Sequence, residues 1–309
     1  MSLNVISPGF LSLLQDYGRF GYQRIGVTNG GPMDEHAFLW ANKLLDNDYS
    51  CSMVEVSLGK FKARFTQSTM IAITGADMKA EINGERIANW QTHFVHAGDE
   101  IEFSTAESGL RAYLAVQRGF QVEAHLGSVA TVERENIGGL HQDGKALTQG
   151  DSLPYRVADK ITSKQINEKY IPDYSVPLTL RVILGYQSDA FSKNRMNRFF
   201  SSMYTVTNNI NRMGYRLSGP SVNSEVMDGI VSEGISLGAI QVPKDGQPIV
   251  LMRDRQTIGG YPKLGCVSHL DLSRLAQRGP GAKLYFEPVD IAVAEGERLA
   301  YQQFFNIKY

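Results

Sequence analysis

The chain has few of the residues that would place it in a specialised class. Only two cysteines occur in 309 residues, Cys51 and Cys266, and they lie far apart and outside any CxxC pair. This spacing indicates neither a disulfide framework nor a zinc site, and it favours a cytoplasmic location. No run approaches the roughly eighteen apolar residues of a membrane span, so we expect no membrane association.

Neither sign of charge is in excess. The sequence has 31 basic and 32 acidic side chains and a formal net charge of -1. A nucleic-acid-binding domain normally carries a basic excess on one face, so we expect no nucleic-acid partner. The length is typical of about two domains, at roughly 100–200 residues each.

Several common catalytic motifs are also missing. The sequence contains no HExxH, no Walker lysine loop and no GxSxG, so zinc hydrolysis, P-loop nucleotide binding and serine-elbow chemistry lack their required residues. His93 and His96 are three apart in a predicted strand and therefore on opposite faces, so we predict no metal site. Met78 and Lys79 match only part of a biotin-acceptor hairpin, and we expect no covalently attached biotin.

What the chain does contain is short stretches in which apolar and polar residues alternate. The period of two over residues 70–74, 100–103 and 110–116, with a hairpin signal at Asn83-Gly84, predicts a mainly β fold of the barrel type. Helices are few. We predict one that Asp34 caps, one that Asp271 caps, and a third over residues 290–305.

The alternation breaks down in a polar stretch that contains Pro172 and Pro177, and it resumes at Leu178. A linker of this composition is typical of a domain boundary. We therefore predict an N-terminal domain over residues 1–172 and a C-terminal domain over residues 173–309.

Residues 238–262 form the most informative stretch. Two apolar runs, 239–242 and 249–251, flank a segment of turn formers, which predicts a β-hairpin. Beyond the hairpin, Asp254 and Gln256 share one face of an extended segment, and Gly259-Gly260 lets the backbone bend or approach a ligand. Two interpretations stay open: a pocket lined by polar groups, and a strand exit capped by an Asx turn.

Three charged residues elsewhere each have a structural and a functional interpretation. Arg19 and Asp16 flank Gly18, so Arg19 either forms an ion pair within a turn or offers its guanidinium to an anion. Arg212 lies on a turn with no obvious local acidic partner, which favours a functional role. Glu55 lies on a strand face that is either solvated or covered, and a covered carboxylate would indicate a general base or a metal ligand.

Motif blocks, most of which contain glycine, lie along nearly the whole chain: residues 14–21, 26–34, 74–76, 97–99, 113–116, 126–128, 150–151, 212–217, 238–262 and 271–277. Together these blocks closely resemble the carboxyltransferase-like family that includes the C subunit of bacterial 5-oxoprolinase, KipA and allophanate hydrolase subunit 2. Three positions depart from the family pattern. Leu13-Leu14 replaces Thr-Val, Val129 replaces an Arg, and Asn211 replaces an Asp.

The resemblance implies two cyclophilin-like β-barrel domains with a few short packing helices. It also implies a subunit of an ATP-dependent 5-oxoprolinase that opens 5-oxoproline to glutamate in complex with a KipI-like protein, with a LamB/YcsF-like protein as a further partner. ATP and a divalent cation would bind in that complex at a site that the sequence does not locate. Two alternatives stay open: a carboxyltransferase half that acts on urea or a related amide with a partner's carboxybiotin, and a non-catalytic module that antagonises a KipI-like kinase inhibitor.

Opening a lactam with ATP requires groups that bind a carboxylate, hold phosphate and orient water. Arginine, carboxylate and amide side chains suit these tasks. We predict that Asp254, Glu55 and Arg212 are catalytic. The predicted substrate-binding residues are Arg19, Gln241, Gln256 and Tyr261.

Overall fold

The structure of the protein is a computed structural model, which describes residues 1–157, 162–224 and 230–308. The chain divides into two units with dense internal contacts. The first unit comprises Met1–Phe20 and Gly30–Ser175, and the second comprises Gly21–Asn29 and Val176–Tyr309. The sequence pattern predicts one boundary after residue 172 and does not indicate that Gly21–Asn29 belongs with the second unit.

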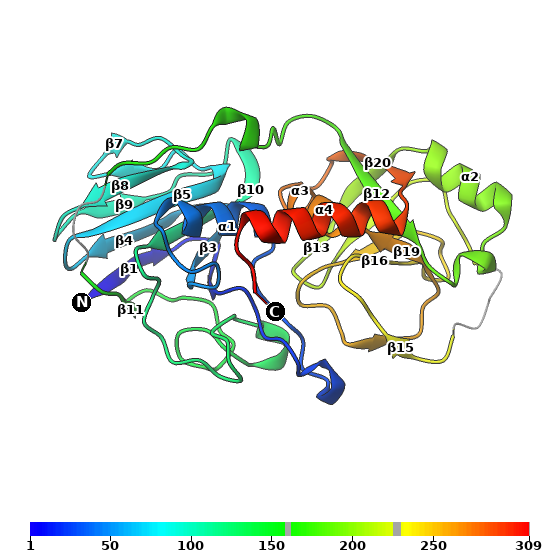
Figure 1. The fold of residues 1–309 in the computed structure, drawn as a ribbon, viewed down its shortest axis with the longest axis horizontal. Coiled ribbons are helices and arrows are strands. Elements are labelled where there is room, and N and C mark those ends of the chain that lie inside the picture. Colours follow the sequence, from blue (N-terminus) through cyan, green and yellow to red (C-terminus); the bar gives the residue numbers. More distant parts are fainter. Residues whose placement is uncertain (158–161, 225–229, 309) are drawn as a thin grey trace. The chain divides into compact units, whose positions relative to one another are not determined.

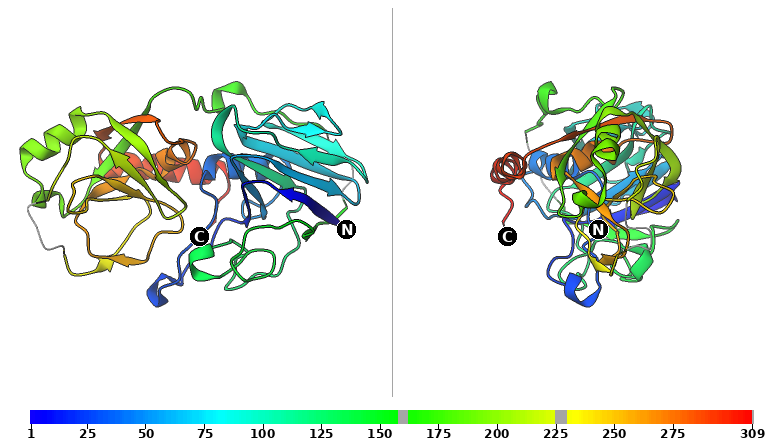
Figure 2. Two further views of the ribbon diagram at one scale, coloured as in Figure 1. Left: turned by 180° about the vertical axis from the view of Figure 1, so that it is seen from behind. Right: turned by 90° about the vertical axis from the view of Figure 1, so that its right-hand side faces the viewer.

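Among the residues that the structure describes, the first unit contains two antiparallel sheets and one α-helix (Figures 1 and 2). One sheet has the strand order β11-β1-β4-β9-β6-β7 and the other has the order β2-β3-β10-β5-β8. The elements are β1 (Ser2–Pro8), β2 (Leu11–Gln15), α1 (Glu35–Leu44), β3 (Met53–Ser57), β4 (Phe61–Phe65), β5 (Thr69–Asp77), β6 (Glu81–Ile82), β7 (Glu85–Arg86), β8 (Gln91–Val95), β9 (Glu100–Glu102), β10 (Ser108–Val116) and β11 (Ser152–Pro154). Helix α1 packs on β5 and β10.

The apolar residues of the alternating strands build the core between the two sheets. Phe61, Ala63 and Phe65 of β4 share one face and are fully buried, whereas Lys62 and Arg64 between them are more exposed. They pack in one cluster with Ile73 and other apolar residues of the second sheet. The prediction of a mainly β fold is confirmed. Within the described residues, however, this unit consists of two sheets and not of the closed barrel that we expected.

Two local predictions for the first unit are confirmed. Asn83 and Gly84 have positive φ of 53° and 85° and connect β6 to β7 in a hairpin. Asp34 caps α1, because its carboxylate accepts from the backbone N–H of Ala37 at 3.0 Å. The cap fixes the position at which the chain enters the helix.

The second unit contains a closed barrel with the strand order β12-β19-β16-β17-β14-β13-β20, in which the parallel pair β12 and β20 closes the ring. A ribbon of β15 and β18 is separate from it. The elements are β12 (Leu178–Leu184), α2 (Lys193–Ser201), β13 (Tyr204–Ile210), β14 (Gly214–Ser218), β15 (Glu233–Gly234), β16 (Ala239–Gln241), β17 (Ile249–Leu251), β18 (Ile258–Gly259), β19 (Lys263–Val267), α3 (His269–Leu275), β20 (Lys283–Pro288) and α4 (Ile291–Phe304). The hairpin predicted within residues 239–251 is confirmed as β16 and β17.

The helices of the second unit confirm one prediction and correct another. Asp290 caps α4 by accepting from the N–H of Ala292 at 2.8 Å, as the composition of residues 290–305 predicts. Asp271 is not an N-cap, because α3 begins at His269. Its carboxylate instead accepts from the guanidinium of Arg181 at 3.0 and 2.8 Å. Arg181, which is distant in sequence, thus binds the Asp271 carboxylate that the sequence pattern assigns to the helix N-cap.

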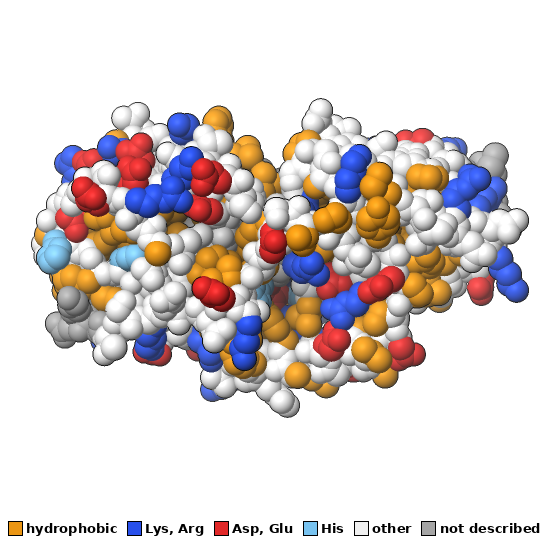
Figure 3. Space-filling view, turned by 90° about the horizontal axis from the view of Figure 1, so that it is seen from above, with side chains coloured by type: hydrophobic (Ala, Val, Ile, Leu, Met, Phe, Trp, Pro, Cys, Tyr) orange, Lys and Arg blue, Asp and Glu red, His pale blue; other side chains and the backbone are white. Residues whose placement is uncertain are grey.

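None of the described helices is long and apolar enough to cross a membrane. Figure 3 shows acidic and basic side chains interspersed on the face that it draws, in keeping with the net charge of -1. Short 3-10 helices occur at Gln23–Ile25, Glu133–Glu135, Glu168–Tyr170 and Ser188–Ala190.

Candidate functional site

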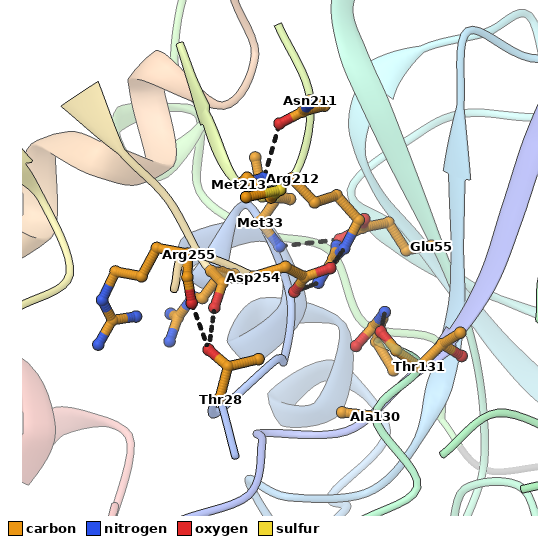
Figure 4. A network of polar contacts seen from close by, with 12 residues as sticks. Thr28, Met33, Glu55, Ala130, Thr131, Asn211, Arg212, Met213, Asp254 and Arg255 are labelled. Atoms are coloured by element: carbon orange, nitrogen blue, oxygen red, sulfur yellow. Dashed lines mark hydrogen bonds and ion pairs between the residues drawn. The ribbon is translucent and has the colours of Figure 1, made fainter. Parts of the chain in front are cut away.

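A buried ion pair joins two of the predicted catalytic residues in the second unit (Figure 4). Arg212 lies in the turn between β13 and β14, and Asp254 lies just after β17. The guanidinium donates through Nε at 2.8 Å and Nη2 at 3.0 Å to the two carboxylate oxygens. Both side chains are buried. The sequence shows no local acidic partner for Arg212, and the barrel brings one against it from 42 residues away.

The segment that carries Asp254 is held by backbone contacts. The N–H of Asp254 donates to the carbonyl of Arg212 at 2.8 Å. The Thr28 hydroxyl, from Gly21–Asn29, lies within 3.0 Å of the carbonyl of Arg255 and within 3.4 Å of that of Arg253, as Figure 4 shows. These bonds fix the run Arg253-Asp254-Arg255, all three of which are buried.

Arg255 is a buried cation whose Nε donates to the carbonyl of Ile235 at 3.1 Å. In the part of the chain that the structure describes, no carboxylate forms an ion pair with it. Burial, and secondarily the charge of Arg253, lowers the pKa of Arg255 to about 10. A bound anion would offset this cost, so Arg255 is suited to hold a carboxylate or a phosphate.

The two predicted amides meet at Gly259, the first residue of the late glycine pair. A Cβ at this position would lie 2.9 Å from Nε2 of Gln241 and 3.3 Å from Nε2 of Gln256, so the ends of both amide side chains lie against Gly259. Gln241 is buried, and its Nε2 has no hydrogen-bond partner within the described ranges. The fourth predicted substrate-binding residue, Tyr261, is 46% exposed.

A pocket of about 350 Å³ lies within the second unit. Some of its lining residues are strand partners of Gly259 and Gln241. Its walls come from the end of β12 and the turn after it, from β15 and the start of β16, and from β19. The strand register places Gly259 and Gln241 next to the pocket, because Glu233 pairs with Gly259 and Lys263 pairs with Gln241. In the described part of the chain, none of the site residues predicted from the sequence lines this pocket, and Gln241 is connected to it only as the strand partner of Lys263.

A polar cluster forms one end of this pocket, and we name it the Glu233 cluster. Lys263 and Gln187 donate to Oε1 of Glu233, and the Tyr186 hydroxyl donates to Oε2. These donors, Lys263 first, lower the pKa of Glu233. The backbone N–H of Lys263 also donates to Oε1 of Gln187 at 2.8 Å, which fixes the amide orientation.

The other end of the pocket is less polar and contains a thiol. Cys266 of β19 donates through Sγ to the carbonyl of Leu237 at 3.0 Å, and the Ser236 hydroxyl lies 3.7 Å from the sulfur. Burial raises the pKa of the Cys266 thiol, so it remains protonated at neutral pH. Its position indicates a packing and lining role.

All three charged or phenolic members of the Glu233 cluster lie outside the set of site residues predicted from the sequence. Lys263 directly follows the Gly-Gly-Tyr-Pro run, so the end of that motif was one available signal. Tyr186 and Glu233 are 47 residues apart and carry no comparable local pattern. The pairing of β19 with both β12 and β16, together with the pairing of β15 with β18, brings them together.

Glu55 lies in the first unit, on strand β3, where every residue is buried. Its Oε2 accepts from the Met33 N–H at 2.8 Å and from the Tyr113 hydroxyl at 2.7 Å. The Tyr113 oxygen in turn accepts from the N–H of Asp34 at 2.8 Å. Arg111 is buried, with Nε 3.9 Å from Oε1 of Glu55. The strand face whose surroundings the sequence left open is thus covered, and the carboxylate anchors the segment that leads into α1.

Arg19 is fully buried in the first unit and is directed at backbone carbonyls. Its Nε donates to His125, and its Nη2 donates to Ser128 and to Ala130, at 3.1 to 3.3 Å. Asp16 accepts instead from the Gly18 and Val129 N–H groups and from the Ser128 hydroxyl. Arg19 thus holds the loop that carries these carbonyls, and its role in substrate binding stays a prediction.

Two departures from the family pattern can be placed within these contacts. Val129 uses its backbone N–H to bond Asp16, so this contact does not depend on its side chain. Asn211 accepts from the N–H groups of Met213 at 2.8 Å and Gly214 at 3.1 Å. An aspartate could accept the same two bonds, so Asn211 preserves the turn that presents Arg212.

Alkaline pH should expose the role of Tyr113. Burial first, and then the Glu55 charge, raise its pKa well above the usual value near 10. The unfolded chain loses this proton above about pH 10 and the folded chain keeps it. The contribution of the protonated Tyr113 hydroxyl to the free energy of unfolding is therefore complete below pH 10, and above that pH it falls by about 1.4 kcal/mol per pH unit. We expect Tyr113→Phe, measured by urea unfolding with tryptophan fluorescence, to have a shallower alkaline slope; equal slopes would contradict this.

Comparisons with known proteins cover nearly the whole chain. The family model described as carboxyltransferase domain, subdomain A and B, matches residues 25–288. The chain is 31% identical to the C subunit of 5-oxoprolinase from Escherichia coli (strain K12), over 98% of this chain and 96% of that protein. It is 34% identical to the C subunit of 5-oxoprolinase from Haemophilus influenzae, over 94% and 93%. The crystal structure of the K. lactis urea amidolyase matches with a TM-score of 0.91 at 28% identity, over 98% of this chain and 20% of that one.

Proposed function

Because this chain belongs to the family of carboxyltransferase domains with subdomains A and B, we propose that it is a subunit of an ATP-dependent 5-oxoprolinase that opens 5-oxoproline to glutamate. The observation that carries this proposal is the nearly end-to-end match with two proteins named as the C subunit of 5-oxoprolinase. The match with urea amidolyase, in contrast, covers one fifth of a much longer chain. A match over 96% of a protein that is itself named as a subunit favours the function of that subunit.

The chemistry of the second unit supports an amide substrate. A lactam is a stable amide, and phosphorylation of its oxygen would make the carbon electrophilic and the oxygen easier to lose. Such a site needs a cation for the substrate carboxylate or the phosphate, and amides that orient water or the ring. Arg255 and the Gln241 amide offer these groups. The Arg212–Asp254 pair keeps the segment before Arg255 in place.

ATP and its divalent cation do not fit the residues described in this chain. Among residues 1–157, 162–224 and 230–308, no three His, Cys, Asp or Glu side chains gather as metal ligands. The cation of the pocket, Lys263, is already paired with the carboxylate of Glu233, which would repel a triphosphate. We derive no step through ATP on this chain and propose that nucleotide binding involves the partner proteins, one KipI-like and one LamB/YcsF-like.

Three finer points belong to the same proposal. We propose that both units are of the cyclophilin-like type, the first as a variant with two sheets. The cytoplasmic location and the absence of covalently attached biotin stay predictions. The carboxyltransferase alternative, with urea and a partner's carboxybiotin, is favoured by one observation, the TM-score of 0.91 with urea amidolyase.

Reconstitution tests the proposal directly. The chain is purified with the products of its neighbouring genes, and glutamate formed from 5-oxoproline is measured with and without ATP. We expect glutamate only when ATP and all subunits are present. Biotin-dependent carboxylation of urea without any glutamate would replace the proposal with the carboxyltransferase alternative. Tight partner binding without either reaction would indicate the regulatory module.

A further inference from the structure

The Glu233 cluster has hydrogen-bonding capacity that the protein leaves unused. An ammonium has three N–H donors, and in the described part of the chain the Lys263 ammonium bonds only to Glu233. A carboxylate has about four acceptor positions, of which Glu233 fills three, two on Oε1 and one on Oε2. An acceptor therefore remains beside a cationic donor, at the polar end of the pocket.

This pairing complements one edge of a cyclic amide. In a lactam ring the C=O and N–H lie side by side, whereas an ordinary trans peptide directs them to opposite sides. A ring could accept from Lys263 through its oxygen and donate through its nitrogen to Oε2 of Glu233. Both bonds involve a charged partner and are therefore stronger than bonds between neutral groups. We propose that the pocket binds the cis-amide edge of a small cyclic amide through Lys263 and Glu233.

The rest of the pocket suits a small ring. Its volume of about 350 Å³ lies at the lower end of the usual range for ligand sites, roughly 300–1,000 Å³. Ile183, Leu184 and Ala239 supply apolar walls for ring methylenes. The Lys263 side chain is only 12% exposed, so its donors are shielded from bulk water. Shielding of this kind strengthens a polar contact with a ligand.

The inference rests on the proposed function only in taking 5-oxoproline as the amide. The cyclic urea of a ureido ring has the same cis-amide edge, so the pocket chemistry alone does not separate the two sources. A lactam and a cyclic urea must therefore be compared as separate probes.

Binding to the full chain, without partners or ATP, is the appropriate test. Ligand-detected NMR titrations compare 2-pyrrolidone, N-methyl-2-pyrrolidone, which lacks the N–H, and 2-imidazolidinone, a cyclic urea. We expect N-methylation to weaken binding about tenfold or more, as expected for one lost hydrogen bond to a charged group. Glu233→Gln and Lys263→Met should each weaken 2-pyrrolidone binding by a similar factor. Lys283→Met, at a lysine whose Nζ donates to Thr205 in the same barrel, is the matched control.

The outcomes separate this inference from the proposed function. Equal affinity for 2-pyrrolidone and its N-methyl derivative, or no binding of either, would overturn the inference even if the reconstituted complex forms glutamate. This comparison uses the unaltered protein and does not depend on the folding of a variant. Binding that requires Glu233, in a chain whose complex forms no glutamate, would support the inference and remove the proposed function. A preference for 2-imidazolidinone would support the cis-amide edge and identify a ureido ring as the occupant.

Discussion

Replacing Asp254 with alanine is expected to lower the free energy of unfolding of the second unit by about 3–5 kcal/mol. The reason is that the Arg212 guanidinium, which is buried, would lose the carboxylate that now accepts from both Nε and Nη2. Removing the carboxylate partner of a buried charge costs far more than an exposed pair contributes. Urea unfolding followed by far-ultraviolet circular dichroism measures this change.

The chain supplies a matched control for this variant. Asp245, in the turn between β16 and β17, pairs with Arg216 of β14, and its side chain is 50% exposed. Asp245→Ala removes the same chemical group from the same kind of pair, and we expect a loss of about 0–1 kcal/mol. Asp254→Asn, which keeps an acceptor oxygen, should lie between the two. If Asp254→Ala and Asp245→Ala have the same effect, burial does not govern the contribution of the Arg212–Asp254 pair.

Replacing Glu55 with alanine is expected to destabilise the first unit by a similar amount, about 3–5 kcal/mol. The Met33 N–H and the Tyr113 hydroxyl would lose their acceptor, and Arg111 would lose a carboxylate in its buried surroundings. Both tryptophans, Trp40 and Trp90, belong to the first unit. Tryptophan fluorescence in urea therefore reports this unit selectively.

Glu102 provides the comparison for Glu55. It lies on strand β9 of the same unit, pairs with Lys62, and has a side chain that is 53% exposed. Glu102→Ala should change the free energy of unfolding by about 1 kcal/mol or less. Glu55→Gln tests the catalytic role that the sequence predicts. Lost turnover with stability retained would support a catalytic base, whereas parallel losses would show that the carboxylate is an anchor.

Local sequence rules were sufficient where a feature depends on neighbouring residues. The turn residues between 242 and 249 and the Asn83-Gly84 pair predict hairpins that the structure contains. Asp34 and Asp290 cap helices because the capping bond spans only two or three residues. Asp271 shows the limit of the rule, since its carboxylate on α3 accepts instead from Arg181 of strand β12.

The candidate site depends on contacts that no local rule contains. Arg212 meets Asp254 across 42 residues, and Tyr186 meets Glu233 across 47. Strand pairing and barrel closure bring these side chains into contact. A single sequence does not specify the register between strands that are so far apart in the chain. The sequence does point to Gly259, because a Gly-Gly pair can be recognised without knowledge of distant contacts.

Because Gly21–Asn29 belongs to the second unit, the two units cannot be separated by a single cut in the chain. Three crossings of the backbone, after residues 20, 29 and 175, connect the two units. A fragment that starts at Val176 would lack Thr28, and the carbonyls of Arg253 and Arg255 would lose the hydroxyl beside them. We therefore expect residues 176–309 alone to be less stable than the same barrel with the nine residues Gly21–Asn29 joined to it.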